Sequence, residues 1–129
     1  QLHFAYLDMA WHSLTELPEG DVLAFEQKTL APYAVMPSVA GTGFSPSFSH
    51  IFAGGYSAGY YSYKWAEVLE ADAFSLFKEK GIFNKEVAGS FRKNILEKGG
   101  AEDEAAIYRN FRGHDPEPEA LMEKLGLVK

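Results

Sequence analysis

Apolar side chains recur at three- and four-residue intervals along most of this chain, and no stretch alternates apolar and polar residues as a strand would. The longest such pattern runs from Ser57 to about Lys80 and is stopped by Gly81. Shorter patterns of the same kind cover residues 85–98, 103–111 and 118–125. Because this spacing places apolar residues on one face of a helix, the sequence predicts an all-α fold.

The first half of the chain predicts two more helices and a long loop. Residues 1–16 are apolar nearly all round, which is typical of a buried helix. A second helix is expected from Val22 to Ala31, with Asp21 as its N-cap. Prolines, glycines and serines without an apolar period then predict an irregular connection. The expected divisions of one continuous segment are two helices over 1–31, a loop over 32–56, a central helix over 57–80 and terminal helices over 84–127.

Charged residues are unevenly distributed along the 129 residues. Residues 1–64 carry only seven of them, whereas residues 65–129 carry 23. A stand-alone domain covers its surface with polar groups, so we expect something else to cover the charge-poor half. The chain is therefore expected to be a piece of a larger protein.

Composition excludes several classes of partner and site. A net charge of -6 disfavours binding to nucleic acid or to an anionic membrane surface, since both need clustered cations. No stretch approaches the roughly 20 apolar residues of a membrane span, and we see neither a signal peptide nor an anchor. The absence of cysteine excludes disulfides and Cys-type metal sites and is typical of a reducing compartment.

Histidines and serines indicate no metal site and no nucleophile within the chain. The four histidines include no His-Glu-x-x-His motif and no pair at the i, i+4 spacing of a helical metal site. Asp8 lies four residues before His12, which we interpret as a local structural contact. We expect none of the serines to act as a nucleophile.

Aromatic residues concentrate in the middle of the chain. Of 19 aromatic residues (10 Phe, 7 Tyr and 2 Trp), eight lie within residues 44–65, with His50 among them. On a helix, Tyr56, Tyr60 and Tyr63 form one stripe. A stripe of this kind is more often core than site, but tyrosine suits both because its ring packs while its hydroxyl forms hydrogen bonds.

The residues beside this stripe extend the pattern. Tyr61 and Trp65 form a second stripe about 100° further round, so that one face can pack as core while the other forms a site. Gly54 and Gly55 precede the first tyrosine. They permit positive φ or a close approach of the backbone to a ligand, as in a flexible loop over a cleft.

The run from His50 to Trp65, HIFAGGYSAGYYSYKW, resembles the C-terminal signature of a zinc metallopeptidase family. That family includes thimet oligopeptidase, oligopeptidase A and bacterial peptidyl-dipeptidase, and the similarity looks closest to peptidyl-dipeptidase. The likeness extends to the opening LDMAWH, to FKEKGIFNKEVAGSFRKNILEKGG and to the ending YRNFRGHDPEPEALMEKLGL. The resemblance implies a helical peptidase fold that acts on short peptides in the cytoplasm.

The same resemblance implies that part of the enzyme is missing. In that family, zinc is bound by a His-Glu-x-x-His helix and by a further glutamate, all of which lie N-terminal to the matched part. The chain is therefore expected to be the C-terminal segment of the catalytic domain, with zinc present only in the intact enzyme and held by the N-terminal part of the same polypeptide. By itself, the chain is expected to be inactive.

Roles for individual side chains also follow from the resemblance. It implies that Tyr63 donates a hydrogen bond to the carbonyl oxygen of the cleaved peptide, where negative charge develops, and that His50 binds substrate or intermediate beside it. A Gly-Gly hinge would let the loop close over the substrate. Tyr61 and Trp65 are expected in the core. Contacts to the bound peptide are implied for Tyr56, Tyr60, Gly54 and Gly55.

A second interpretation stays open from the residues alone. Because the 129 residues contain no recognisable set of metal ligands, the chain is alternatively a non-catalytic helical module. Such a module would use its aromatic groove to bind a peptide or a protein partner.

Overall fold

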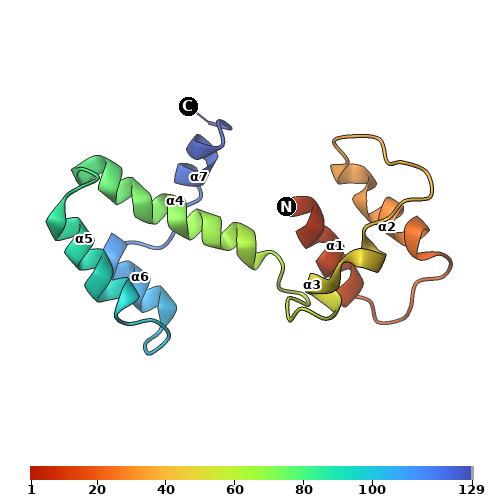
Figure 1. Ribbon diagram of the computed structural model, residues 1–129, viewed down its shortest axis with the longest axis horizontal. Helices are drawn as coiled ribbons and strands as arrows, with labels where there is room; N and C mark the ends of the chain where they lie inside the picture. The colour runs from red at the N-terminus through yellow and green to blue at the C-terminus, as the bar shows by residue number, and fades with distance from the viewer. Residues whose placement is uncertain (129) are drawn as a thin grey trace. The chain divides into compact units, whose positions relative to one another are not determined.

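The computed structural model describes residues 1–128, and those residues form helices, turns and loops without a strand (Figure 1). The predicted all-α fold is confirmed. The chain divides into two compact units, with the boundary between Lys64 and Trp65. The units are described separately.

The first unit contains two longer helices followed by shorter ones. Its core consists of Leu7, Leu30, Phe48 and Ile51, all buried. Since these residues come from three different helices and the loop, burial of their side chains holds the first unit together. Its elements are α1 (Leu2–His12), α2 (Val22–Leu30), the 3₁₀ turns η1 (Ala31–Tyr33) and η2 (Ser45–Ser47), and the short helix α3 (Ser49–Phe52).

The first helix is less buried than its sequence predicts. It ends at His12, and its buried residues are Ala5, Leu7 and Asp8. Leu2 stays 58% exposed although it is apolar. A helix that is apolar all round buries only the side that packs on other elements, and within residues 1–64 the rest of α1 has no such cover.

A buried carboxylate ties the long connection after α2 to that helix. Both oxygens of Glu26 accept backbone N–H groups, from Phe44 at 2.8 Å and from Ser45 at 2.6 Å. The indole N–H of Trp11 also donates to the Ser45 hydroxyl, at 2.9 Å. Burial opposes ionisation of Glu26, but the hydrogen bonds from Ser45 and Phe44 outweigh it, and the pKa of Glu26 is lowered. The connection is therefore an ordered loop.

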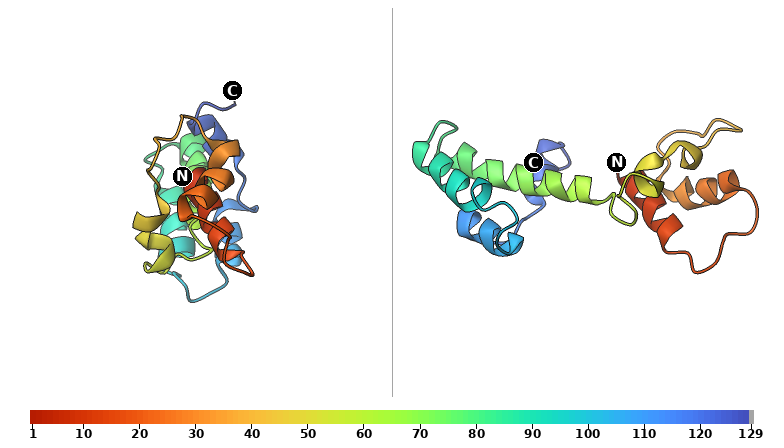
Figure 2. Two further views of the ribbon diagram at one scale, coloured as in Figure 1. Left: turned by 90° about the vertical axis from the view of Figure 1, so that its right-hand side faces the viewer. Right: turned by 60° about the horizontal axis from the view of Figure 1, so that its bottom comes forward.

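The second unit is built on the long helix α4 (Ser62–Lys80), whose first three residues belong to the first unit. Figures 1 and 2 show α5 and α6 side by side in this unit. The Asn84 side chain caps α5 by accepting the N–H groups of Glu86 and Val87, and the side chain of Asp103 caps α6. The other elements are α5 (Lys85–Phe91), the π-helical turn η3 (Arg92–Leu96), α6 (Glu104–Arg112) and α7 (Glu119–Lys124).

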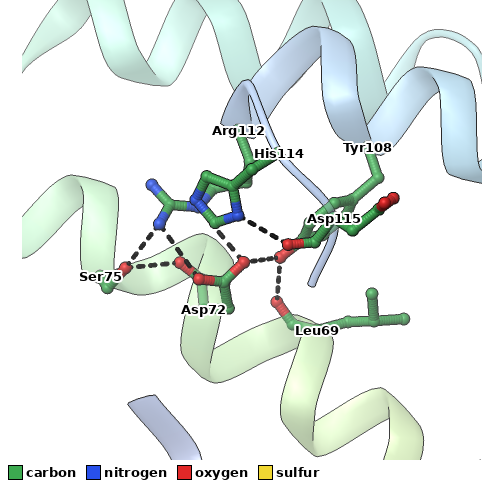
Figure 3. A network of polar contacts seen from close by, with 7 residues as sticks. All are labelled: Leu69, Asp72, Ser75, Tyr108, Arg112, His114 and Asp115. Atoms are coloured by element: carbon green, nitrogen blue, oxygen red, sulfur yellow. Dashed lines mark hydrogen bonds and ion pairs between the residues drawn. The ribbon is translucent and has the colours of Figure 1, made fainter. Parts of the chain in front are cut away.

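A buried polar network joins α6 to α4 (Figure 3). Asp72 of α4 is 3% exposed, accepts the Tyr108 hydroxyl at 2.5 Å and pairs with Arg112 Nη2 at 3.0 Å. The same Arg112 nitrogen donates to the Ser75 hydroxyl at 3.1 Å. Burial disfavours the charged carboxylate, yet the hydrogen bonds from Arg112 and Tyr108 lower the pKa of Asp72. Burial and the hydrogen bond to Asp72 raise the pKa of Tyr108.

Candidate functional site

Four side chains selected from the sequence meet in one aromatic cluster of the first unit. The Tyr63 ring lies 5.0 Å from the Tyr60 ring and 5.2 Å from the Tyr56 ring, measured between centroids. His50 lies 6.0 Å from Tyr60 and 6.1 Å from Tyr56. We call these four residues the aromatic cluster. Their proximity is an observation, whereas the roles implied for them stay predictions.

A tight loop brings His50 and Tyr56 together. The backbone N–H of Tyr56 donates to the carbonyl of His50 at 3.1 Å, which closes the loop between them. A Cβ on Gly54 would lie 2.8 Å from the Cα of His50, so glycine is required there by the close approach of the backbone. Gly55 has a φ of +80°, which favours glycine for a different reason. The predicted hinge motion of this loop stays a prediction.

The tyrosines reach the cluster through turns and not through a continuous helix. The central helix was expected from Ser57, but α4 begins at Ser62 and residues 57–61 form turns. Ala58 has a φ of +53°, which is incompatible with a right-handed helix. The N–H of Ser62 then donates to the carbonyl of Gly59 at 3.0 Å, immediately before α4. The prediction that the three tyrosines lie on one continuous helix is therefore wrong, although their rings do meet.

The cluster is anchored on one side and open on the other. Tyr60 packs edge-on against the buried Phe48 ring, at 5.0 Å, and belongs to the margin of the core. Tyr56 and Tyr63 are 37% and 39% exposed, and His50 is exposed. Tyr56, Tyr63 and His50 therefore present part of their surface on the open side of the first unit.

The surroundings of Tyr63 favour its neutral, protonated form. A hydrogen bond with Tyr56, followed by desolvation and the electrostatic influence of Tyr56 and Tyr60, raises the pKa of Tyr63 above its ordinary value of 10.0. At neutral pH, Tyr63 therefore keeps its proton. In chemical terms it is a neutral hydrogen-bond donor placed among other rings.

Sequence reasoning missed the part that Asp8 plays. This carboxylate contacts His12, as expected, with its Oδ1 2.8 Å from the ring Nδ1. It also accepts the backbone N–H groups of Ala58 and Tyr60, both at 2.9 Å. The one available signal was a single acidic residue within the otherwise apolar LHFAYLDMAWH helix, because a charge in such a place needs partners.

Tyr61 and Trp65 do not take the positions predicted for them. Both were expected in the core, yet they are 56% and 51% exposed. Trp65 lines an open, mostly apolar groove of the second unit, about 1150 Å³ in volume. The prediction failed because stripe spacing identifies a shared face of a helix but not whether another element covers that face.

Residues 55–59, Gly-Tyr-Ser-Ala-Gly, also match the Gly-x-Ser-x-Gly pattern of a serine nucleophile elbow. An elbow needs a strand before the serine, and residues 1–128 contain no strand. The Ser57 hydroxyl donates to the carbonyl of Ile51, so it braces the loop. The match to the pattern therefore does not make Ser57 a candidate nucleophile.

The described residues offer no metal centre and no membrane helix. Among residues 1–128, no group of three or more His, Asp or Glu side chains is arranged to hold a metal ion. Over the same range, every helix is too short or too polar to cross a bilayer.

Comparison with known proteins places the chain among peptidases. Residues 1–127 match the family model described as peptidase family M3. Oligopeptidase A of Escherichia coli (strain K12) is 46% identical over 98% of the chain and 19% of that protein. A relative from Arabidopsis thaliana, "Organellar oligopeptidase A, chloroplastic/mitochondrial", is 43% identical over 99% of the chain and 17% of that protein. The dipeptidyl carboxypeptidase of Salmonella typhimurium is 40% identical over 95% of the chain and 18% of that protein.

Two facts follow from these identities. The chain spans about a fifth of the length of the relatives that it matches. The identities to the oligopeptidases A exceed the identity to the dipeptidyl carboxypeptidase, so they do not support the expectation that the chain is closest to peptidyl-dipeptidase.

Proposed function

The chain belongs to peptidase family M3, and we propose that it is the C-terminal part of a zinc metallopeptidase that hydrolyses short peptides. The observation that carries this proposal is the aromatic cluster, in which Tyr56 and Tyr60 each lie 5.0 to 6.1 Å, between ring centroids, from both His50 and Tyr63. Zinc would be held outside this chain, because residues 1–128 include no group of three potential ligands. The N-terminal part of the same polypeptide would supply those ligands.

The proposed role of Tyr63 follows from the charge that develops in peptide hydrolysis. As the carbonyl carbon is attacked, negative charge grows on the carbonyl oxygen, and a fixed neutral donor beside that oxygen lowers the barrier. The raised pKa of Tyr63 and its 39% exposure support this role. The Tyr60 ring contacts both Tyr63 and His50, and His50 would bind substrate or intermediate beside Tyr63.

The proposed peptide contacts involve the rest of the loop. Tyr56 is exposed and lies against both His50 and Tyr63, so a peptide that meets one of these residues meets the others. The space beside Gly55 is open, which would let a bound peptide approach its backbone closely, whereas the corresponding space at Gly54 is filled by the His50 backbone, so Gly54 would act by keeping the loop tight. Both glycines would therefore serve substrate binding.

The test is Tyr63→Phe in the intact protein. We expect kcat to fall by about 10²–10³-fold, with a much smaller rise in KM, because the lost hydrogen bond is formed in the transition state. Zinc content should not change, because Tyr63 is not a ligand. Steady-state kinetics on a short fluorogenic peptide would measure both constants.

Tyr61→Phe is the matched control. It removes the same atom from a tyrosine two positions earlier that is 56% exposed and lies outside the aromatic cluster, so kcat should stay within about twofold of the unmodified enzyme. An unchanged kcat for Tyr63→Phe, or an equal loss in both variants, would refute the assignment.

A non-catalytic peptide-binding or partner-binding module remains the second candidate, because residues 1–128 include no metal-binding group. The two candidates differ in what the complete gene encodes. A His-Glu-x-x-His motif upstream in the same reading frame, with zinc bound to the purified product, supports the peptidase. A complete gene product without that motif supports the binding module.

We place the intact protein in the cytoplasm, on the grounds that the chain has no cysteine and that family members work there. The Arabidopsis relative described as chloroplastic/mitochondrial belongs to organelles, so the compartment needs its own measurement. Cell fractionation with an antibody against this chain would decide it.

A further inference from the structure

We propose that Asp8 is a positioning residue, which fixes the backbone of residues 58–60 and thereby holds the aromatic cluster in its active arrangement. This proposal rests on the proposed peptidase function for its kinetic consequences. It adds to that function a residue of α1 that is 50 positions away from the segment it controls.

The contacts of Asp8 join α1 to the tyrosine segment. Its side chain is 0% exposed. Oδ1 accepts the N–H of Ala58 and Oδ2 accepts the N–H of Tyr60, each at 2.9 Å. Because each oxygen binds a different amide two residues apart, the carboxylate sets both the distance and the orientation of that short stretch of backbone.

His12 orients the carboxylate from the other side. Its Nδ1 lies 2.8 Å from Oδ1 of Asp8 and 2.9 Å from the carbonyl oxygen of the same residue. Both neighbours are acceptors, so Nδ1 must carry the proton. With this donor and two amides, the buried carboxylate has the partners that it needs.

The segment held by Asp8 adopts a conformation that its own sequence does not favour. Ala58 is the one non-glycine residue with positive φ among residues 1–128. Alanine persists in this conformation only where the surroundings enforce it. The local pattern from Ser57 onward predicts helix, whereas the structure has turns up to Ser62. The bonds from Asp8 are the long-range contact that accounts for the difference.

The effect of Asp8 reaches the cluster through Tyr60. The N–H of Tyr60 is held by Asp8, and its ring is the one that touches both His50 and Tyr63. The carbonyl of Tyr60 accepts the N–H of Tyr63 at 3.3 Å, at the start of α4. A shift of the Tyr60 backbone would therefore move the ring that His50 and Tyr63 share.

The kinetic test uses Asp8→Asn in the intact protein. Asparagine keeps the shape of aspartate but offers one acceptor oxygen, so its NH₂ group faces one of the two backbone donors. A displacement of about 1 Å costs up to about 10²-fold in rate, and we expect kcat/KM to fall by about 10- to 10²-fold. Bound zinc should be unchanged.

The decisive readout is the coupling between Asp8 and Tyr63. If Asp8 acts by placing the cluster, Asp8→Asn should lower kcat by less than about threefold when Tyr63→Phe has already removed the donor. If Asp8 has a purely structural role, the losses in kcat caused by Asp8→Asn and by Tyr63→Phe multiply in the double variant, and that result would overturn the proposal. Asp21→Asn is the control: it makes the same chemical change at an exposed carboxylate that forms no cap hydrogen bond, and it should leave kcat within about twofold of the unmodified enzyme.

Hydrogen exchange tests the positioning independently of catalysis. In the intact protein, Asp8→Asn should speed amide exchange at Ala58 and Tyr60 by about tenfold or more, while Asp21→Asn should leave it nearly unchanged. If Asp8→Asn does not fold, the exchange rates of the unmodified protein are compared with those of Ala58→Gly instead. Glycine adopts the positive φ at position 58 without strain, so this variant changes the held segment without removing the carboxylate. Faster exchange at Ala58 and Tyr60 in Asp8→Asn, together with an unchanged kcat when Tyr63→Phe is made in the otherwise unmodified protein, would defeat the proposed function alone. Unchanged exchange at Ala58 and Tyr60 would defeat the positioning role.

Discussion

Gly54 and Gly55 are adjacent, but different physical requirements select them. A Cβ on Gly54 would lie 2.8 Å from the Cα and 2.9 Å from the carbonyl oxygen of His50, so a side chain there collides with backbone. Gly55 has open space around it and is required only by its φ of +80°. A methyl group at Gly54 must therefore displace His50, whereas one at Gly55 strains its own backbone.

Gly54→Ala should lower kcat/KM of the intact protein by about tenfold or more, because His50 and the loop to Tyr56 must move apart. Peptide hydrolysis compared with that of Gly89→Ala would check this. Gly89 lies in α5 with nothing within 4 Å of a Cβ, so alanine there should leave activity intact and stabilise the helix by about 1 kcal/mol. Full activity of Gly54→Ala would show that the loop tolerates displacement.

At the scale of elements, two buried carboxylates connect segments that are distant in sequence. Glu26 ties the loop before α3 to α2, and Asp72 ties α6 to α4. The pKa of each is lowered because hydrogen bonds outweigh burial. A carboxylate with a lowered folded pKa stabilises the folded state above its unfolded pKa, near 4, and that stabilisation is lost as pH falls through the folded value.

Asp72→Asn should reduce the unfolding free energy of the chain by about 3 kcal/mol at neutral pH, because Arg112 loses its buried partner. It should also weaken the loss of stability below about pH 4, where the unmodified chain protonates this group. Urea unfolding followed by circular dichroism at neutral and acid pH would measure both effects.

Asp115→Asn is the control for that measurement. Asp115, which lies beyond the end of α6, pairs with Arg109 of α6 at 2.7 Å, but both side chains are more than half exposed. Its loss should cost less than about 1 kcal/mol, since exposed ion pairs contribute little. Equal costs for the two substitutions would mean that the buried network does not hold α6 to α4.

At the scale of the whole molecule, the boundary between the two compact units coincides with the change in charge density. Residues 1–64 carry seven charged side chains and residues 65–129 carry 23, and the units divide between Lys64 and Trp65. Large apolar side chains stay exposed in both units, including Val35 at 96% and Phe83 at 95%. With relatives about five times as long, these surfaces suit a part of a larger polypeptide.

The isolated 129-residue chain should therefore hydrolyse no peptide, with or without added zinc, because residues 1–128 contain no metal-binding group. Incubation of the purified chain with zinc and a fluorogenic peptide would test this, with the intact protein as the positive control. Zinc-dependent turnover by the chain alone would contradict the prediction.

Much of the fold and part of the candidate site follow from the sequence by itself. Apolar spacing, N-caps such as Asn84 and stops such as Gly81 predict helices because these signals act within about one turn of the chain. The aromatic run indicated the peptidase family and selected Tyr56, Tyr60, Tyr63 and His50, which the structure places in one cluster.

Only the tertiary structure decided what depends on residues far apart. α4 starts at Ser62, after a stretch of turns whose backbone is held by Asp8 at residues 58 and 60, and no local pattern contains that contact. The exposure of Tyr61 likewise depends on which elements cover a face. Periodicity and capping depend on residues that are close in sequence. The partners of a buried carboxylate come from distant segments that meet only in the folded chain, so the contacts of Asp8 are visible only in the structure.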